Sequence, residues 1–410
     1  MGAFLQGNGP VPISSDVRNA GPGAVLRSIV GAPGPNRHRR VRIRLGFAAV
    51  VAAIALGAAA SASGELLAPS KGQVFFGVTD TGQLGDFQAF ADSVGKHPSV
   101  IETFHPWGNS LHYAIPRWGE AQARPMLHIS TVDPNTLAEI ITPQGIADGT
   151  SDDYLIRLNS SFATRGIHAY IRPLGEMNRC LNAWASYDCQ GNSRGPAYTP
   201  FQYKQAFRRI AIIVRGGGTL ADINSRLAAT GLPPLNRQTG NGLEPDNLPA
   251  APVSMVWSPL PGGSPATKKN LPGRFYPGSS YVDWVGTDIY SRYPVWKTLT
   301  RFYKVKKYRR KPFAITEWGV SAGDDPKFVK RIFTWVRRHP RTKMFIYYQD
   351  FGTSNPYRIQ NYPKSRAVIA RNLRQHRYPA LPPDPPPPPS PTTPTDPNEP
   401  PAPPTGGTGG

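Results

Sequence analysis

Short apolar stretches alternate with helical patterns through the middle of this 410-residue chain, and this alternation is what most limits its fold. The apolar stretches are rich in β-branched and aromatic residues and therefore predict strands. They lie at residues 74–78, 100–104, 125–129, 168–174, 253–257, 284–289, 312–316 and 343–348. Helices are predicted between and after them, at residues 87–94, 152–164, 201–214, 296–303, 326–338 and 364–372.

Eight parallel strands that alternate with helices predict an α/β protein with a (β/α)8 TIM barrel. In such a barrel the chemistry lies at the carboxyl ends of the strands. An open, doubly wound sheet is the alternative, but no GxGxxG or phosphate-binding loop follows any of the strands. One helix start is especially clear, because Asp325 precedes Pro326 as an N-cap precedes the first helical residue.

The two ends of the chain differ from the middle, which gives three predicted regions. Residues 1–62 form an N-terminal extension and signal peptide, since five arginines precede an apolar run at 45–60 that ends in Ala60-Ser61-Ala62. This predicts secretion after cleavage near Ala62. The run is shorter than the ~20 apolar residues that span a bilayer, and a membrane-anchored extracellular protein is the alternative. Residues 63–378 form the barrel domain.

The third region, residues 379–410, contains 15 prolines in 32 residues and cannot build a core. Its proline run favours an extended polyproline II segment. Two interpretations stay open: a spacer that holds the domain away from a surface, and a disordered end without a function.

The chain is strongly basic, with a formal net charge of +21. Lys304, Lys306, Lys307, Arg309, Arg310 and Lys311 form the densest cluster. We expect no nucleic-acid partner, because base-reading aromatic or Gly-rich elements do not accompany this cluster. A solvated face is one interpretation, and association with an anionic cell envelope through the basic surface and the Pro-rich tail is the other.

The two cysteines, Cys180 and Cys189, are nine positions apart and should form a disulfide in an exported protein. Two free buried thiols are the alternative. No cysteine or histidine pattern has zinc-site spacing. We therefore expect neither a metal nor another cofactor.

Two carboxylates follow predicted strands in a way that points to catalysis. Arg172 and Glu176 lie on one face at the end of the fourth strand, and Glu317 ends the seventh. Burying a glutamate in so apolar a stretch costs free energy unless its charge is paired or the residue has a catalytic function. Two such residues supply the carboxylate pair that glycoside hydrolysis needs.

The motifs around these residues resemble glycoside hydrolase family 26, a family of retaining clan A enzymes best known for endo-β-1,4-mannanases. They are Arg172-Pro-Leu-Gly-Glu176-Met-Asn178, Val256-Trp257-Ser258-Pro259, Tyr281-Val-Asp-Trp-Val-Gly-Thr-Asp-Ile-Tyr290 and Ile315-Thr-Glu317-Trp-Gly319. The resemblance implies that Glu176 is the acid/base, Glu317 the nucleophile and Tyr290 the donor of a hydrogen bond to the nucleophile. Arg172 would support the same charge. The family usually has His before the acid/base, whereas this chain has Gly175, which leaves mannan specificity open.

A carbohydrate cleft also needs flat rings and hydrogen-bonding side chains. The candidates for substrate binding are Trp107, Asn178, Trp184, Trp257, Trp318 and His105. Trp107 and Trp184 lie in polar loops and are expected at the surface, whereas core packing is an equal alternative for Trp257 and Tyr347. Asn178 and Gln349 either bind sugar hydroxyls or order loops. His105 and His128 are either satisfied barrel histidines or sugar contacts.

The sequence therefore predicts a secreted, monomeric glycoside hydrolase that cleaves a β-linked polysaccharide, with an endo-β-1,4-mannanase as the first choice. A clan A β-glucanase or xylanase is the second. A barrel that only binds envelope glycans is the alternative outside enzymes, and two retained catalytic carboxylates argue against it.

Overall fold

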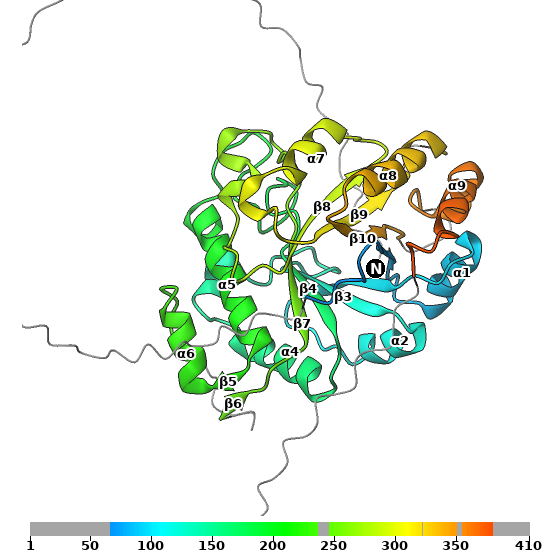
Figure 1. The fold of residues 1–410 in the computed structure, drawn as a ribbon. Coiled ribbons are helices and arrows are strands. Elements are labelled where there is room, and N and C mark those ends of the chain that lie inside the picture. The colour runs from blue at the N-terminus through cyan, green and yellow to red at the C-terminus, as the bar shows by residue number, and fades with distance from the viewer. Residues whose placement is uncertain (1–65, 237–245, 322, 351–354, 380–410) are drawn as a thin grey trace, which may run out of the picture. The chain divides into compact units, whose positions relative to one another are not determined.

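A computed structural model describes residues 66–236, 246–321, 323–350 and 355–379, and these residues form a closed parallel barrel (Figure 1). Around the barrel the strands follow the order β1-β10-β9-β8-β7-β4-β3-β2. They span Phe75–Thr79 (β1), Val100–Pro106 (β2), Arg124–Ser130 (β3), Ala169–Pro173 (β4), Val253–Trp257 (β7), Trp284–Tyr290 (β8), Phe313–Gly319 (β9) and Thr342–Tyr347 (β10). The predicted (β/α)8 barrel and its eight strands are thus confirmed.

Helices cover the outside of the barrel (Figure 1). The predicted ones are α1 (Leu84–Val94), α4 (Asp152–Thr164), α5 (Pro200–Arg215), α7 (Trp296–Tyr303), α8 (Pro326–Arg338) and α9 (Pro363–Leu373). Three more were not predicted: α2 (Ala114–Ala121), α3 (Pro143–Ala147) and α6 (Leu220–Ala228). A two-stranded antiparallel pair, β5 (Gly218–Thr219) with β6 (Asn247–Leu248), lies beside α6. The Asp325 side chain caps α8 as expected, accepting a 2.9 Å hydrogen bond from the Phe328 amide.

The core has two layers. One apolar cluster fills the space between strands and helices, and a second, separate cluster lies inside the barrel around Phe75, Met126, Tyr170 and Trp284. Parallel strands are buried on both faces in this way, which explains their nearly continuous apolar sequences.

The first described residues close the amino-terminal end of the barrel. Trp284 donates a 2.7 Å hydrogen bond to the Leu66 carbonyl, and Tyr170 donates a 2.6 Å hydrogen bond to that of Leu67. We call this end the amino-terminal face, and it is the face turned toward the viewer in Figure 1. The buried carboxylates described below lie at the opposite end, where the strands finish.

The predicted signal segment and all but the first residue of the Pro-rich tail lie outside the described residues. Within the described ranges, no helix combines the length and apolar character needed to cross a membrane.

Candidate active site

Arg172, at the end of β4, is the centre of a buried polar network at the carboxyl ends of the strands. Its side chain is fully buried and donates to Oε1 of Glu102 (2.8 Å), Oδ2 of Asp288 (2.6 Å) and Oγ of Ser258 (2.8 Å). It also donates to Oε1 of Glu317. One guanidinium thus meets carboxylates from β2, β8 and β9, which fixes how these strands present their side chains.

Glu317 reaches this network through an irregularity in β9. Thr287 of β8 pairs with Ile315 but the next residue, Asp288, pairs with Glu317, so Thr316 is an extra residue. Such a bulge changes the direction of the side chains around it. Thr316 accordingly donates to Oδ1 of Asp288 (2.6 Å), while Glu317 contacts Arg172. Two consecutive side chains of β9 therefore join the same network.

Tyr290, the last residue of β8, holds the other oxygen of Glu317 through a 2.5 Å hydrogen bond from its hydroxyl. Burial, and next the charge of Glu317, raise the pKa of Tyr290 well above its usual value. The phenol therefore stays protonated and can donate. The Glu317 side chain is 9% exposed, so its carboxylate lies at the edge of the network rather than deep within it.

Glu176 lies three residues after β4, where the backbone turns sharply. Leu174 and Glu176 both have a φ of 51°, in the left-handed region, and the Glu176 amide donates a 2.8 Å hydrogen bond to the Ser258 carbonyl. A non-glycine residue in this conformation is strained, and such strain concentrates at functional sites. The side chain is 12% exposed and accepts a 3.3 Å hydrogen bond from Arg179.

The pKa of Glu176 is raised. Burial is the main cause, the positive charge of Arg179 opposes it, and the negative charge of Glu317 adds to it. A raised pKa keeps this carboxyl protonated to a higher pH than an exposed glutamate, as a general acid requires.

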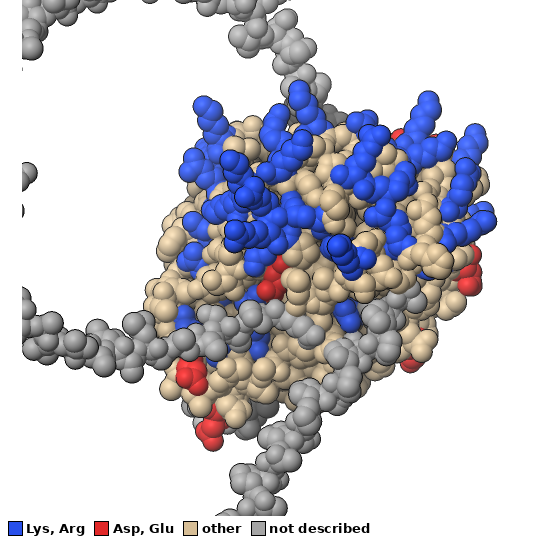
Figure 2. All heavy atoms as spheres, viewed as in Figure 1, with Lys and Arg blue, Asp and Glu red and all other residues tan. Residues whose placement is uncertain are grey.

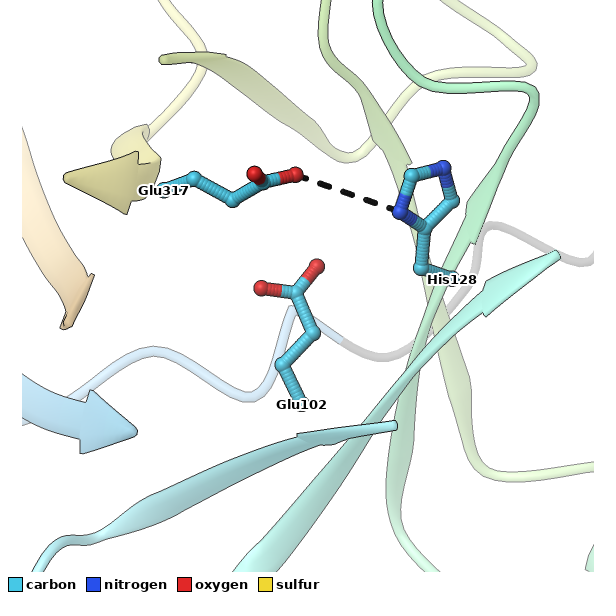
Figure 3. A group of neighbouring side chains, drawn as sticks. All are labelled: Glu102, His128 and Glu317. Atoms are coloured by element: carbon cyan, nitrogen blue, oxygen red, sulfur yellow. Dashed lines mark ion pairs between the residues drawn. The ribbon is translucent and has the colours of Figure 1, made fainter. Parts of the chain in front are cut away.

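Glu102, His128 and Glu317 point toward one another from β2, β3 and β9 (Figure 3), with possible metal-ligand atoms all within 4.8 Å. A positive charge is already present among these groups, because the Arg172 guanidinium lies 2.8 Å from Oε1 of Glu102 and 3.3 Å from Nδ1 of His128. A metal ion would have to sit beside this fixed positive charge. The group is therefore better described as the Arg172 network than as a metal centre.

The protonation of these groups follows from their burial. Burial raises the pKa of Glu102 to about 8 and raises that of Asp288 well above its usual value. Burial, and then Arg172, lower the pKa of His128 well below its usual value, so the imidazole is neutral. The raised pKa values make Glu102 and Asp288 easier to protonate than exposed carboxyl groups, although Arg172 donates a hydrogen bond to each.

The tryptophans expected at the surface are buried, so that prediction is wrong. Trp107 is 2% exposed and packs on Tyr154, with ring centroids 4.8 Å apart. Trp184 is 5% exposed, and its indole donates a 2.9 Å hydrogen bond to the Gly175 carbonyl. Polar neighbours in the sequence did not reveal that these rings pack inward. Trp184 thereby supports the backbone beside Glu176.

The other expected sugar contacts are also buried. Trp257 and Trp318 belong to the layer between barrel and helices, which settles the open alternative for Trp257 in favour of core packing. Asn178 orders a loop, with its side chain bonded to both backbone groups of Leu260. One ring nitrogen of His105 lies 3.0 Å from the Asn109 carbonyl.

Gln349 and Tyr347 are buried as well. The Gln349 backbone is bonded to the Thr79 hydroxyl, and the Tyr347 hydroxyl donates to the Tyr357 carbonyl over 2.9 Å. These contacts place both residues in the scaffold.

Sequence reasoning missed Glu102, Asp288, Arg179 and Phe104. Glu102 interrupts the apolar stretch 100–104 as Glu317 interrupts its own, and the same argument would have found it. Phe104 is 37% exposed at the end of β2, with its ring 4.9 Å from His128 and 5.9 Å from Tyr348. It is thus an accessible ring beside the network.

The expected disulfide joins Cys180 and Cys189, whose Cα atoms are 5.0 Å apart. It closes the loop after Glu176 that contains Trp184. The loop is thus covalently fixed next to the proposed acid.

Part of this site lies in a segment that matches a protein-family model. The sequence model described as "Glycosyl hydrolase family 26" matches residues 255–362, which include Asp288, Tyr290 and Glu317. Over these residues the chain is similar to glycoside hydrolase family 26. A search of curated proteins finds no match.

Solved structures similar to this chain include three mannanases. An endo-beta-1,4-mannanase double mutant from Cellulomonas fimi is 15% identical, with a TM-score of 0.51 over 76% of this chain and 75% of that one. Bacteroides ovatus BoMan26A, a GH26 beta-mannanase, is 16% identical, with a TM-score of 0.49 over 75% and 90%. Bacillus subtilis mannanase BCman is 18% identical, with a TM-score of 0.46 over 75% and 88%. At 15% identity, the likeness to the Cellulomonas fimi enzyme concerns the fold alone.

Proposed function

We propose that this protein is a retaining glycosidase that cleaves a β-linked polysaccharide by double displacement, with Glu176 as acid/base and Glu317 as nucleophile. The observation that carries the proposal is the placement of Glu317. Arg172 holds one of its oxygens and the Tyr290 hydroxyl holds the other, beside a glutamate of raised pKa. This difference in environment is what assigns two carboxyl groups to different roles.

In the first step, protonated Glu176 gives its proton to the glycosidic oxygen as the bond between that oxygen and the anomeric carbon breaks. Glu317 attacks the anomeric carbon from the opposite face and forms a glycosyl ester. Arg172 and Tyr290 orient the attacking carboxylate, because both donors are already in position before substrate binds.

In the second step, Glu176 removes a proton from water, which attacks the anomeric carbon and releases Glu317 as a carboxylate. Esterification has by then removed the negative charge of Glu317, which contributes to the raised pKa of Glu176. The pKa of Glu176 therefore falls when it must act as a base. A retaining pair of this kind has carboxyl groups about 5 to 5.5 Å apart.

We propose an endo-acting enzyme on a β-1,4-linked mannan as the first choice of substrate. The family resemblance supports this choice, and the Cellulomonas fimi neighbour is an endo-beta-1,4-mannanase. Phe104, with Tyr348 and Tyr357 beside Tyr290, offers rings on which a sugar face can pack.

Gly175 is the main reason to test other polysaccharides. A Cβ atom at this position would lie 2.9 Å from both Nε of Arg172 and Nε2 of His128. The residue before the proposed acid therefore contributes no side chain to the cleft.

The test is the release of reducing sugar from mannan, glucomannan, xylan and mixed-linkage glucan, with Glu317→Ala as the inactive control. Release of internal fragments from mannan, together with β-configured first products by NMR, supports the proposal. Initial α-configured products overturn the retaining mechanism. Activity confined to xylan or mixed-linkage glucan overturns the choice of mannan.

We further propose that the chain is exported after cleavage near Ala62 and that its catalytic domain, residues 63–378, is monomeric. The arginine-rich segment and the apolar run at 45–60 support this proposal. Mass spectrometry of protein recovered from the medium tests it, and an intact N-terminus in a membrane fraction would favour the anchored alternative.

A further inference from the structure

The basic residues of the chain are distributed very unevenly along the barrel. Residues 66–288 contain 18 Lys and Arg against 17 Asp and Glu, whereas residues 289–379 contain 22 against 4. The first part is therefore nearly neutral, and almost the whole excess charge belongs to the segment that runs from the end of β8 through α9. Random surface charge would not separate in this way.

Much of this charge lies at the amino-terminal face. Residues 304–311 connect α7 to β9, and residues 339–341 connect α8 to β10, so both segments lie where strands begin. Figure 2 shows this face, with Lys and Arg gathered over the part formed by α7, α8 and α9 and few acidic residues among them. We define the basic face by six exposed side chains: Lys304, Lys306, Arg309, Arg310, Arg337 and Arg338.

These six side chains are not neutralised. None of them forms an ion pair with an acidic group in the part of the chain that the structure describes. Arg337, for example, donates only to the side chains of Asn372 and Thr334. The face therefore keeps a positive potential that attracts anions over about a Debye length, ~8 to 10 Å at ordinary ionic strength.

The rings near the basic face are covered. Tyr308 and Trp335 are 3% and 6% exposed, and the Arg341 guanidinium lies 4.1 Å from the ring centroid of Tyr303. Proteins that bind single-stranded nucleic acid need exposed rings on which bases stack. The face instead offers charge without exposed rings, which suits a surface of phosphate groups.

The chain also enters the barrel at this face. Leu66 lies there, held by Trp284, and only residues 61–65 separate it from the apolar run at 45–60.

We infer that the basic face binds the surface of a membrane that contains anionic phospholipid. Juxtamembrane Lys and Arg side chains are each attracted to such a surface, and the attraction weakens with salt. The active-site network lies at the other end of the barrel, so the bound protein keeps its cleft open to a polysaccharide. The inference does not depend on which glycan is cleaved.

The experiment measures co-sedimentation of the full chain with phosphatidylcholine vesicles, with and without about 30% phosphatidylglycerol. The variant is Arg309→Gln/Arg310→Gln. Its control is Lys268→Gln/Lys269→Gln, which removes two exposed lysines from the segment after β7, at the carboxyl-terminal end of the barrel. We expect the first pair to weaken binding to anionic vesicles about 30-fold and the control to change it little. Both variants should keep wild-type glycosidase activity, which shows that they fold.

Salt and a competing polymer complete the test. Binding through the basic face should fall strongly between about 50 and about 500 mM salt, whereas insertion of the run at 45–60 would respond neither to salt nor to Arg309 and Arg310. Equal binding of both variants, or no preference for phosphatidylglycerol, overturns the inference. Binding to soluble RNA or to an acidic polysaccharide with no binding to the vesicles overturns it as well.

Discussion

The Tyr290 hydroxyl donates a 2.5 Å hydrogen bond to Oε2 of Glu317, while Arg172 donates to Oε1 of the same carboxylate. The two donors come from β8 and β4, which are separated in the barrel by a single strand, β7. Both oxygens are thus fixed, and rotation of the carboxylate would break a hydrogen bond. This arrangement suits a nucleophile that must attack in one direction.

We expect Tyr290→Phe to lower kcat/KM about 10- to 100-fold, because a hydrogen bond to a charged group contributes about 1.5–3 kcal/mol. The ring remains, so the thermal unfolding midpoint should change little. Steady-state kinetics on the best substrate measures the effect. Tyr293→Phe, which changes an exposed tyrosine after β8, is the control and should leave both quantities unchanged.

The buried carboxyl of Glu102 predicts a pH dependence of stability. Its pKa is about 8 in the folded protein against 4.5 for an exposed glutamate. Between these values the folded state holds a proton that the unfolded state has released. The free energy of unfolding therefore falls as pH rises through this window, by at most about 1.4 kcal/mol per pH unit.

Glu102→Gln keeps an oxygen for Arg172 but cannot titrate, so its unfolding midpoint should fall less between about pH 5 and about pH 8. Calorimetry across this range measures the difference. The exposed residue Glu120 gives the control variant Glu120→Gln, which should follow the wild type. Parallel curves for wild type and Glu102→Gln would show that Glu102 does not hold the proton.

The barrel could be predicted because each strand carries its own signal. Parallel strands buried on both faces are continuous apolar stretches, and all eight were visible in the sequence. Helices α2 and α6 were missed for the opposite reason. Only three residues of α2 and two of α6 are buried, so the apolar periodicity that would predict these helices is weak.

The carboxylates of the site were predictable only in part. Glu176 and Glu317 stand out as charges that end apolar strands, but nothing local shows that Glu102 and Asp288 share Arg172 with Glu317. That relation depends on the pairing of β2, β4, β8 and β9, which are far apart in sequence. The prediction that Trp107 and Trp184 lie at the surface was wrong for a similar reason. Helices and loops that are distant in sequence bury these rings, and the residues next to each tryptophan in the sequence do not reveal this.

Arg179 should set the upper pH limit of activity. Its charge lowers the pKa of Glu176, opposing burial. Arg179→Met should therefore raise the pKa of Glu176, keep the acid protonated to higher pH and move the alkaline limb of kcat/KM upward. The shift should be modest, because the Arg179 side chain is 28% exposed to solvent. Arg292→Met, at an exposed arginine after β8, is the control, and a limb that moves downward would contradict the proposed acid role.

Gly175 should tolerate no side chain. In Gly175→Ala the new methyl group would lie 2.9 Å from both Arg172 and His128, and overpacking of this kind costs about 1–3 kcal/mol. We expect a lower unfolding midpoint and lower activity. Because His128 forms one side of the contact, the loss of stability on adding Gly175→Ala should be smaller in a His128→Ala background. A double-mutant cycle by calorimetry measures this coupling, and strictly additive effects would place the strain elsewhere.

The catalytic pair itself predicts two different losses. Glu317→Ala removes the nucleophile and should abolish turnover on every substrate. Glu176→Ala should still form the glycosyl-enzyme from a dinitrophenyl glycoside, because this leaving group needs no proton, but hydrolysis of the ester then lacks its base. A rapid burst followed by slow turnover is therefore expected.

Azide distinguishes the roles of the two residues. As an anion it can attack the glycosyl-enzyme without a base, so it should accelerate the slow phase of Glu176→Ala and leave Glu317→Ala inactive. Two displacements at one carbon restore the starting configuration, and the glycosyl azide should therefore be β when examined by NMR. An α-configured azide from Glu176→Ala would mean that azide displaced the leaving group in a single step, which would contradict the assignment of Glu317 as nucleophile. Full activity of Glu176→Ala on polysaccharide would instead move the acid role to another carboxyl of the cleft. Asp288 would be the first to test, because it bonds Arg172 and its own pKa is raised by burial.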